Sequence, residues 1–157
     1  MFEDFFLKHQ GYVGSKKKHS AVVVDYAHTP DALKKSLQTL AKQFNKKIDL
    51  VFGCGGDRDQ GKRYKMGRIA NQFASKIYLT NDNPRSENPN FIISQIKKGC
   101  PKSKIILDRK IAIRSAIKNL NTDSILLIAG KGHENYQIIN NKKKYFSDQK
   151  VSKKFLK

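Results

Sequence analysis

Charged and polar side chains are concentrated in five loops of this sequence, and each loop follows a short apolar run. The loops span residues 25–30, 53–63, 81–85, 108–109 and 130–134. Arginine and lysine suit carboxylate or phosphate groups, and arginine offers them a planar, bidentate fork. Aspartate and glutamate could face an ammonium group or a metal ion. These residue types therefore predict a site for a small zwitterionic or anionic molecule.

The densest of these loops is glycine-rich. Gly53, Gly55 and Gly56 follow an apolar run at 48–52 and precede a cluster of alternating charges. Glycine lets the backbone turn tightly and approach a ligand without a Cβ in the way. Neither G-x-x-x-x-G-K-[ST] nor G-x-G-x-x-G occurs, so the stretch is not a standard nucleotide loop. Two interpretations stay open: a substrate loop, or a plain turn with a solvated charge cluster.

Individual candidates follow from the same loops. The cationic ones are Arg58, Arg85 and Lys131, and the acidic ones are Asp25, Asp57, Asp82 and Glu134. Pro84 restricts its loop and would hold Arg85 in a fixed direction. No two histidines or acids have a metal-ligand spacing, so we expect no self-contained metal site.

Three side chains allow a chemical and a structural interpretation. His28 could donate to a phosphate or could only support the start of a helix. His133 could form an acid–base pair with Glu134. Cys54 could be a nucleophile only with a histidine beside it, and a small buried thiol is the simpler interpretation.

The elements that position these loops alternate along the chain. Apolar runs at 21–24, 48–52, 77–80, 105–107 and 124–129 predict buried strands. Helical spacing predicts a helix from Thr29-Pro30-Asp31, another over 66–74, and others from Asn88-Pro89, Asp108 and Ser147-Asp148. Residues 136–139 and 144–146 predict a hairpin around Asn140-Asn141, added as an antiparallel edge. The pattern indicates an α/β fold with a mainly parallel sheet and an antiparallel C-terminal hairpin.

The ends of parallel strands explain why the loops matter together. In a parallel sheet all five loops share the carboxyl edge, where open α/β folds bind ligands. The opposite edge, at residues 45–47 and 119–123, carries no comparable chemistry. This asymmetry is the main evidence for a site.

Bulk properties limit the function class. The 157 residues suit one domain, and we expect it to span 20–157, with residues 1–19 as a lead-in or truncated linker. The net charge of +19 raises nucleic acid as a partner, but the lysines occupy termini, turns and helix ends without an RNA-binding aromatic motif. No apolar run approaches the ~20 residues of a membrane span, and no secretory signal is evident, so we expect a cytoplasmic protein.

Four loop motifs together resemble the C-terminal domain of the Mur ligase family. They are Asp25-Tyr-Ala-His-Thr-Pro-Asp-Ala, the stretch Phe52–Arg63, Asp82-Asn-Pro-Arg85 and Gly130-Lys-Gly-His-Glu134. They occur in the family's order and spacing, and the resemblance runs from about Val13 to the C-terminus. Asp82-Asn-Pro-Arg85 is similar to the motif of the diaminopimelate-adding branch. Residues 1–12 and the missing Gly-Lys-Thr phosphate loop depart from the family pattern.

The resemblance implies a Rossmann-like three-layer domain and an ATP-dependent ligase of peptidoglycan synthesis. Such a ligase joins meso-diaminopimelate to UDP-MurNAc-L-Ala-D-Glu through an acyl phosphate, with ATP and Mg²⁺ bound mainly by a central domain. Residues implied to contact meso-diaminopimelate are Arg58, Asp82, Asn83, Pro84, Arg85, Gly130 and Glu134. Asp25 and His28 would lie toward ATP. We expect no catalytic or metal-binding side chain here, a monomer, and no activity by the chain alone. The alternative is a free-standing basic module that binds a polyanion such as nucleic acid.

Overall fold

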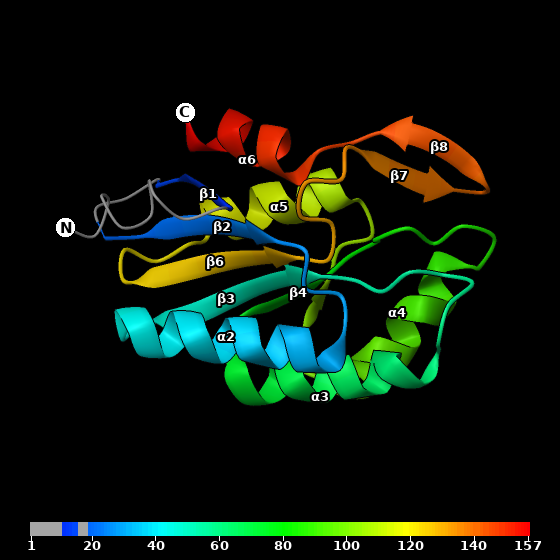
Figure 1. Cartoon of the computed structure of the whole chain (residues 1–157), viewed down its shortest axis with the longest axis horizontal. Coiled ribbons are helices and arrows are strands. Elements are labelled where there is room, and N and C mark those ends of the chain that lie inside the picture. The colour runs from blue at the N-terminus through cyan, green and yellow to red at the C-terminus, as the bar shows by residue number, and fades with distance from the viewer. Residues whose placement is uncertain (1–10, 16–18) are drawn as a thin grey trace.

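A central sheet of six strands organises the protein, whose computed structural model describes residues 11–15 and 19–157 (Figure 1). Its order is β1-β2-β6-β3-β4-β5. The strands are β1 (Tyr12–Gly14), β2 (Ala21–Asp25), β3 (Lys47–Phe52), β4 (Ile77–Leu79), β5 (Lys104–Ile105) and β6 (Ser124–Ala129). Neighbours from β2 to β5 pair in parallel, and β1 pairs antiparallel with β2. The mainly parallel sheet is therefore confirmed.

Helices cover both faces of this sheet and complete three layers. On one face lie α2 (Pro30–Phe44), α3 (Gly61–Phe73) and α4 (Pro89–Lys97), and on the other lie α5 (Arg109–Lys118) and α6 (Asp148–Leu156) (Figure 1). Side chains alternate between faces along a strand, so Leu50 and Phe52 pack in one core cluster and Val51 in the other. Because both faces are covered, the strands are almost continuously apolar.

Four helices begin at the side chains that the sequence indicated. Thr29 accepts a hydrogen bond from the Ala32 amide, and Asp108 accepts one from the Ile111 amide. Asn88 and Ser147 cap α4 and α6 in the same way. Each cap satisfies an amide that has no partner within the helix. The caps of α2, α4 and α5 also fix where the loops after β2, β4 and β5 turn into helices.

The C-terminal hairpin is present, but its predicted position at the edge of the main sheet is wrong. Strands β7 (Tyr136–Ile139) and β8 (Lys142–Tyr145) form a separate two-stranded sheet. The hairpin contacts the loop after β4 instead, where the Arg85 amide donates to the carbonyl of Ile138 over 3.0 Å. The antiparallel edge of the main sheet is β1, which lies in the stretch 1–19 where no element was predicted.

Two predicted boundaries also shift. Helix α3 begins at Gly61, five residues before the predicted start at Met66, and its buried face includes Arg63. Strand β5 covers Lys104–Ile105 rather than 105–107 and is exposed at the sheet edge. In the described part of the chain, no helix is long and apolar enough to cross a membrane.

Candidate amino-acid-binding site at the carboxyl edge

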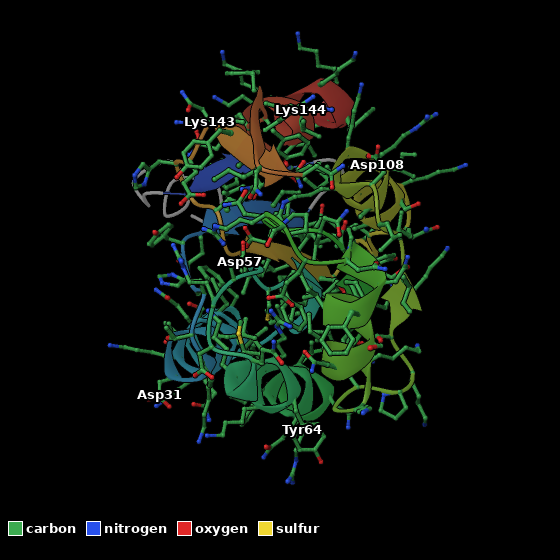
Figure 2. The ribbon with its side chains drawn as sticks, turned by 90° about the vertical axis from the view of Figure 1, so that its right-hand side faces the viewer. Asp31, Asp57, Tyr64, Asp108, Lys143 and Lys144 are labelled. Carbon is green, nitrogen blue, oxygen red and sulfur yellow. The ribbon has the colours of Figure 1, made fainter. Side chains whose placement is uncertain are left out.

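A cavity of about 430 Å³ opens at the carboxyl edge of the sheet. Its lining comes from the loops after β2, β3, β4 and β6 and from the first residues of α3 and β7. The lining residues are Tyr26, His28, Thr29, Gly55, Arg58, Asp59, Lys62, Asp82, Asn83, Arg85, Gly130, Glu134 and Tyr136. Figure 2 looks onto this edge, with Asp57 near its centre and Lys143 and Lys144 of β8 toward the top. Four of the five predicted loops thus meet in one place.

The loop after β4 is held from two sides, which fixes Arg85. The backbone of Arg85 has φ of 53°. Its amide donates to the carbonyl of Ile138, and its carbonyl accepts from the Asn141 amide over 3.3 Å. On the other side, Nη1 of Arg85 donates to the carbonyl of Gly56 over 2.8 Å. Among the described residues, the Nη2 and Nε groups of Arg85 have no hydrogen-bond partner. One side of the guanidinium is therefore anchored, and the remainder is available to a ligand.

Two glycines are required by close contacts in this site. A Cβ on Gly56 would lie 1.9 Å from the carbonyl oxygen of Pro84, so only glycine lets the two loops approach. Gly130 has φ of 116°, and its Cβ would lie 2.6 Å from Oδ2 of Asp82. Pro84 itself does not line the cavity, so its part is to shape the loop.

Arg63 supports the glycine-rich loop from behind, although the sequence did not single it out for this role. It is completely buried and donates to both carboxylate oxygens of Glu87 over 2.8 and 2.9 Å, and to the carbonyl of Gly55 over 3.2 Å. Hydrogen bonds from Arg63 lower the pKa of the Glu87 carboxyl below its ordinary value. The available signal was spacing, because Arg63 lies on the same helical face as Met66 and Ala70.

Lys131 is the second buried cation of the site. Its Nζ donates to Oδ1 of Asn83 over 2.9 Å and lies 3.5 Å from carboxylate oxygens of both Asp82 and Glu134. Its side chain is completely buried. The Asn83 oxygen also accepts the Ile138 amide over 3.0 Å, so the amide NH₂ of Asn83 is the group left to donate to a ligand. With one cation between two anions, this cluster carries one net negative charge, which suits an ammonium group.

The two residues expected on the ATP side lie in different surroundings. His28 lines the cavity, with its Nδ1 2.9 Å from the carbonyl of Tyr26. Asp25 lies outside it, and its carboxylate accepts from the Ala27 amide over 3.1 Å and from the Ser36 hydroxyl over 2.7 Å. Both oxygens of Asp25 thus shape the loop that carries His28.

Two of the alternatives raised by the sequence can now be decided. Glu134 lines the cavity described above and pairs with Lys131, whereas His133 lines a neighbouring cavity with its ring 5.8 Å from that of Tyr26, so the described contacts do not join the two residues as an acid–base pair. Cys54 is buried with its Sγ 3.6 Å from Sδ of Met66, and burial raises the pKa of its thiol to about 12. The thiol therefore stays protonated at neutral pH, which confirms the structural interpretation of Cys54.

The loop after β5 does not line the cavity. Arg109 is buried and forms a bidentate pair with Asp148 over 2.8 and 2.7 Å. It also donates to the carbonyls of Ala129 and Asn81 over 3.1 and 3.2 Å. Arg109 thus ties α5 and α6 to the ends of two strands. No group of three or more histidine, cysteine, aspartate or glutamate side chains within residues 11–15 and 19–157 is placed to hold a metal ion.

Comparison with known proteins identifies the family. Residues 12–132, well over half of the chain, match the family model described as Mur ligase, glutamate ligase domain. The chain belongs to this family. The site thus lies in a Mur ligase domain, and the loops that carry it fall within the matched residues except for Glu134 and Tyr136.

Relatives of this Mur ligase domain carry a common name. The UDP-N-acetylmuramoyl-L-alanyl-D-glutamate–2,6-diaminopimelate ligases of Buchnera aphidicola subsp. Schizaphis graminum and Haemophilus ducreyi are 54% and 50% identical to it over 138 and 143 residues. The matches cover 86% and 89% of this chain and 28% of each relative. The chain therefore spans less than a third of the length of these relatives.

Solved structures show the same fold. A structure of a UDP-N-acetylmuramoyl-L-alanyl-D-glutamate–2,6-diaminopimelate ligase matches with a TM-score of 0.87 and 39% identity, covering 94% of this chain and 31% of that one. A murein peptide ligase from Psychrobacter arcticus matches with a TM-score of 0.62 at 12% identity, covering 95% of this chain and 29% of that one. The second likeness supports the fold alone, and the Rossmann-like three-layer class of the Mur ligase domain is confirmed.

Proposed function

We propose that this chain is the amino-acid-binding domain of an ATP-dependent ligase that adds meso-diaminopimelate to UDP-MurNAc-L-Ala-D-Glu. The observation that carries the proposal is the cavity, which is lined both by Arg85 and by Asp82 and Glu134, the two acids paired with Lys131. Relatives at 50–54% identity, named as ligases of this reaction, support it.

The chemistry of diaminopimelate fits this distribution of charge. Its far carbon bears both a carboxylate and an ammonium group. Arg85, with its free guanidinium nitrogens, receives the far carboxylate in a charge-assisted hydrogen bond. Glu134 and Asp82 receive the far ammonium. The positive φ of Gly130 keeps a side chain away from Asp82.

The near end of the amino acid must leave its amine free to attack. Arg58 is exposed, and its Nη1 donates to the carbonyl of Asp57 over 3.2 Å at the mouth of the cavity. We assign Arg58 to the near carboxylate. Holding the amine in line with an acyl phosphate is a positioning role, and such orientation accounts for a large part of many rate enhancements.

The described residues hold no metal-binding cluster, and the sequence contains no phosphate-loop motif. We therefore assign the ATP phosphates, Mg²⁺ and the UDP-sugar to other domains of a longer ligase, where ATP would activate the acceptor carboxylate. We assign His28, which lines the cavity, to the ATP side. Because ATP is the co-substrate, we place the reaction in the cytoplasm.

A domain graft tests this function. Residues 12–157 would replace the corresponding segment of the Buchnera relative, and amide formation would be followed with meso-diaminopimelate. We expect ligation by the graft and at least tenfold weaker ligation when it carries Glu134→Gln, because the ammonium loses a charged partner. A graft that binds ATP and the UDP substrate yet ligates no meso-diaminopimelate would refute the proposal.

Strand β8 favours one other candidate function. Lys142, Lys143 and Lys144 are all exposed, and the neighbouring Tyr145 is 64% exposed, so a basic and aromatic surface faces outward beside the site (Figure 2). Such a surface suits a single-stranded nucleic acid. Binding of an oligonucleotide that weakens steeply with salt and is lost on changing the three lysines to serine would support it. Equal weak binding by the variant would reject it.

A further inference from the structure

We propose that Lys131 sets the charge preference of the cavity, as the buried counter-ion of Asp82 and Glu134. The inference rests on the proposed function, and it assigns to Lys131 a positioning role that acts through the two acids. Lys131 does not line the cavity; it lies behind the wall formed by those acids.

The environment of Lys131 shows why a cation is needed there. Burying an ammonium group is costly unless it is paired and hydrogen-bonded. Its Nζ has three oxygen partners, at 2.9 Å on Asn83 and 3.5 Å on Asp82 and Glu134, which match its three N–H donors. The ring of Tyr136 lies 5.6 Å from the same nitrogen. These partners come from the loops after β4 and β6 and from β7, so one cation joins three segments.

The charges that line the cavity show what this cation changes. The lining carries three positive side chains, Arg58, Lys62 and Arg85, and three negative ones, Asp59, Asp82 and Glu134. These charges cancel, and Lys131 behind the wall adds one positive charge. Without it the acidic side of the cavity would hold two uncompensated carboxylates. The cavity would then favour cations over amino acids of zero net charge.

Three amino acids that differ mainly in charge separate this role from a purely structural one. At neutral pH, L-lysine carries one net positive charge, meso-diaminopimelate carries none, and L-2-aminopimelate carries one net negative charge. Loss of the Lys131 charge should weaken binding least for L-lysine, more for meso-diaminopimelate and most for L-2-aminopimelate. Loss of a structural support alone would weaken all three ligands by the same factor.

The experiment is calorimetric titration of the purified chain at pH 7 with each of the three amino acids. For Lys131→Met we expect the affinity for meso-diaminopimelate relative to L-lysine to fall at least about tenfold. The affinity for L-2-aminopimelate should fall at least about tenfold further, as for unit charges no more than ~12 Å apart at an effective dielectric constant near 20. Lys118→Met, at an exposed position at the far end of α5, is the matched control and should change neither ratio. Equal weakening of all three ligands by Lys131→Met would overturn the proposal.

A second experiment, urea denaturation without ligand, tests the role of Lys131 independently of the proposed function. The urea midpoint should fall in Lys131→Met and recover in part in Lys131→Met/Glu134→Gln, because the second change removes one of the two uncompensated carboxylates. If the single variant does not fold, folding of the double variant supports the counter-ion role. A double variant no more stable than the single one overturns it. If the unaltered chain binds none of the three amino acids, the proposed function fails, and this second experiment still decides the role of Lys131.

Discussion

Replacing Arg85 by alanine removes the guanidinium that we assign to the far carboxylate of meso-diaminopimelate. The backbone should tolerate the change. Arginine and alanine both carry a Cβ, so the φ of 53° is no more strained than before, and the backbone hydrogen bonds to Ile138 and Asn141 remain. The lost intramolecular contacts are those from Nη1 to the carbonyls of Gly56 and Asn83, at 2.8 and 3.4 Å.

The size of the effect follows from what lysine lacks. L-lysine has no far carboxylate, so with lysine bound Arg85 has no anionic partner while partly desolvated. Losing one member of a desolvated pair costs ~2–5 kcal/mol. Arg85 is only partly buried and one of its nitrogens is already engaged, which favours the lower part, about 2–3 kcal/mol. At ~1.4 kcal/mol per factor of ten, Arg85 should account for about 30- to 150-fold selectivity.

The assay compares kcat/KM for meso-diaminopimelate and L-lysine in the grafted ligase. Arg85→Ala should remove most of the selectivity, whereas Arg58→Ala should weaken both amino acids alike because both have a near carboxylate. Gly55→Ala is a companion that keeps the charge: its Cβ would lie 2.8 Å from Nη1 of Arg85 and should displace the guanidinium, lowering the ratio in part. An unchanged ratio in Arg85→Ala would show that Arg85 is not the selector.

The purified chain should turn over no ATP, because its described residues hold no metal-binding cluster and its sequence no phosphate loop; phosphate release that disappears in His28→Ala would contradict this. Asp148→Asn should lower the free energy of unfolding by about 3–5 kcal/mol in urea denaturation, because it leaves Arg109 buried without its anion. A loss below ~1 kcal/mol, as for exposed pairs, would contradict that reasoning. Cys54 should resist iodoacetamide at pH ~8.5, where a free thiol is about half ionised, because burial raises its pKa to about 12. Alkylation in the folded chain at the rate seen in urea would refute this.

Local sequence was sufficient where short-range chemistry decides the structure. The apolar runs that became β2, β3 and β6 were recognisable because a sheet covered on both faces needs continuous hydrophobic side chains. Thr29-Pro30 and Asp108 were recognisable as helix starts because a capping side chain bonds the backbone amide only three residues further on. The gathering of four loops in one cavity followed from the rule that parallel strands end at one edge.

Features that depend on distant contacts were missed. The burial of Arg63 and of Lys131, which had been named only as a candidate cation, was not predicted because charged residues are usually exposed. Their hydrogen-bond partners Glu87 and Asn83 lie 24 and 48 residues away in the chain. The three residues of β1 are too few to show a period. The hairpin packs on the loop of Arg85 through backbone hydrogen bonds, which no side-chain pattern encodes.

Asp25 illustrates a limit of assigning roles by loop position. It ends β2 at the correct edge, yet its carboxylate turns back to Ala27 and Ser36. Which way a side chain points at a strand end depends on the local turn and on the helix beside it. Its assignment to the ATP side stays a prediction, as do the ligand contacts of Arg58, Asn83 and Glu134.

The most direct test of the central claim is an NMR titration of the ¹⁵N-labelled chain with meso-diaminopimelate. We predict saturable amide shifts in residues 55–62, 82–83, 85 and 130–136, with residues 45–47 and 119–123 at the opposite edge of the sheet unaffected. Arg85→Ala should weaken the saturation without moving the set of shifted residues. No saturable shift at millimolar ligand, or shifts centred on the opposite edge or on β8, would contradict the assignment of this cavity to the amino acid.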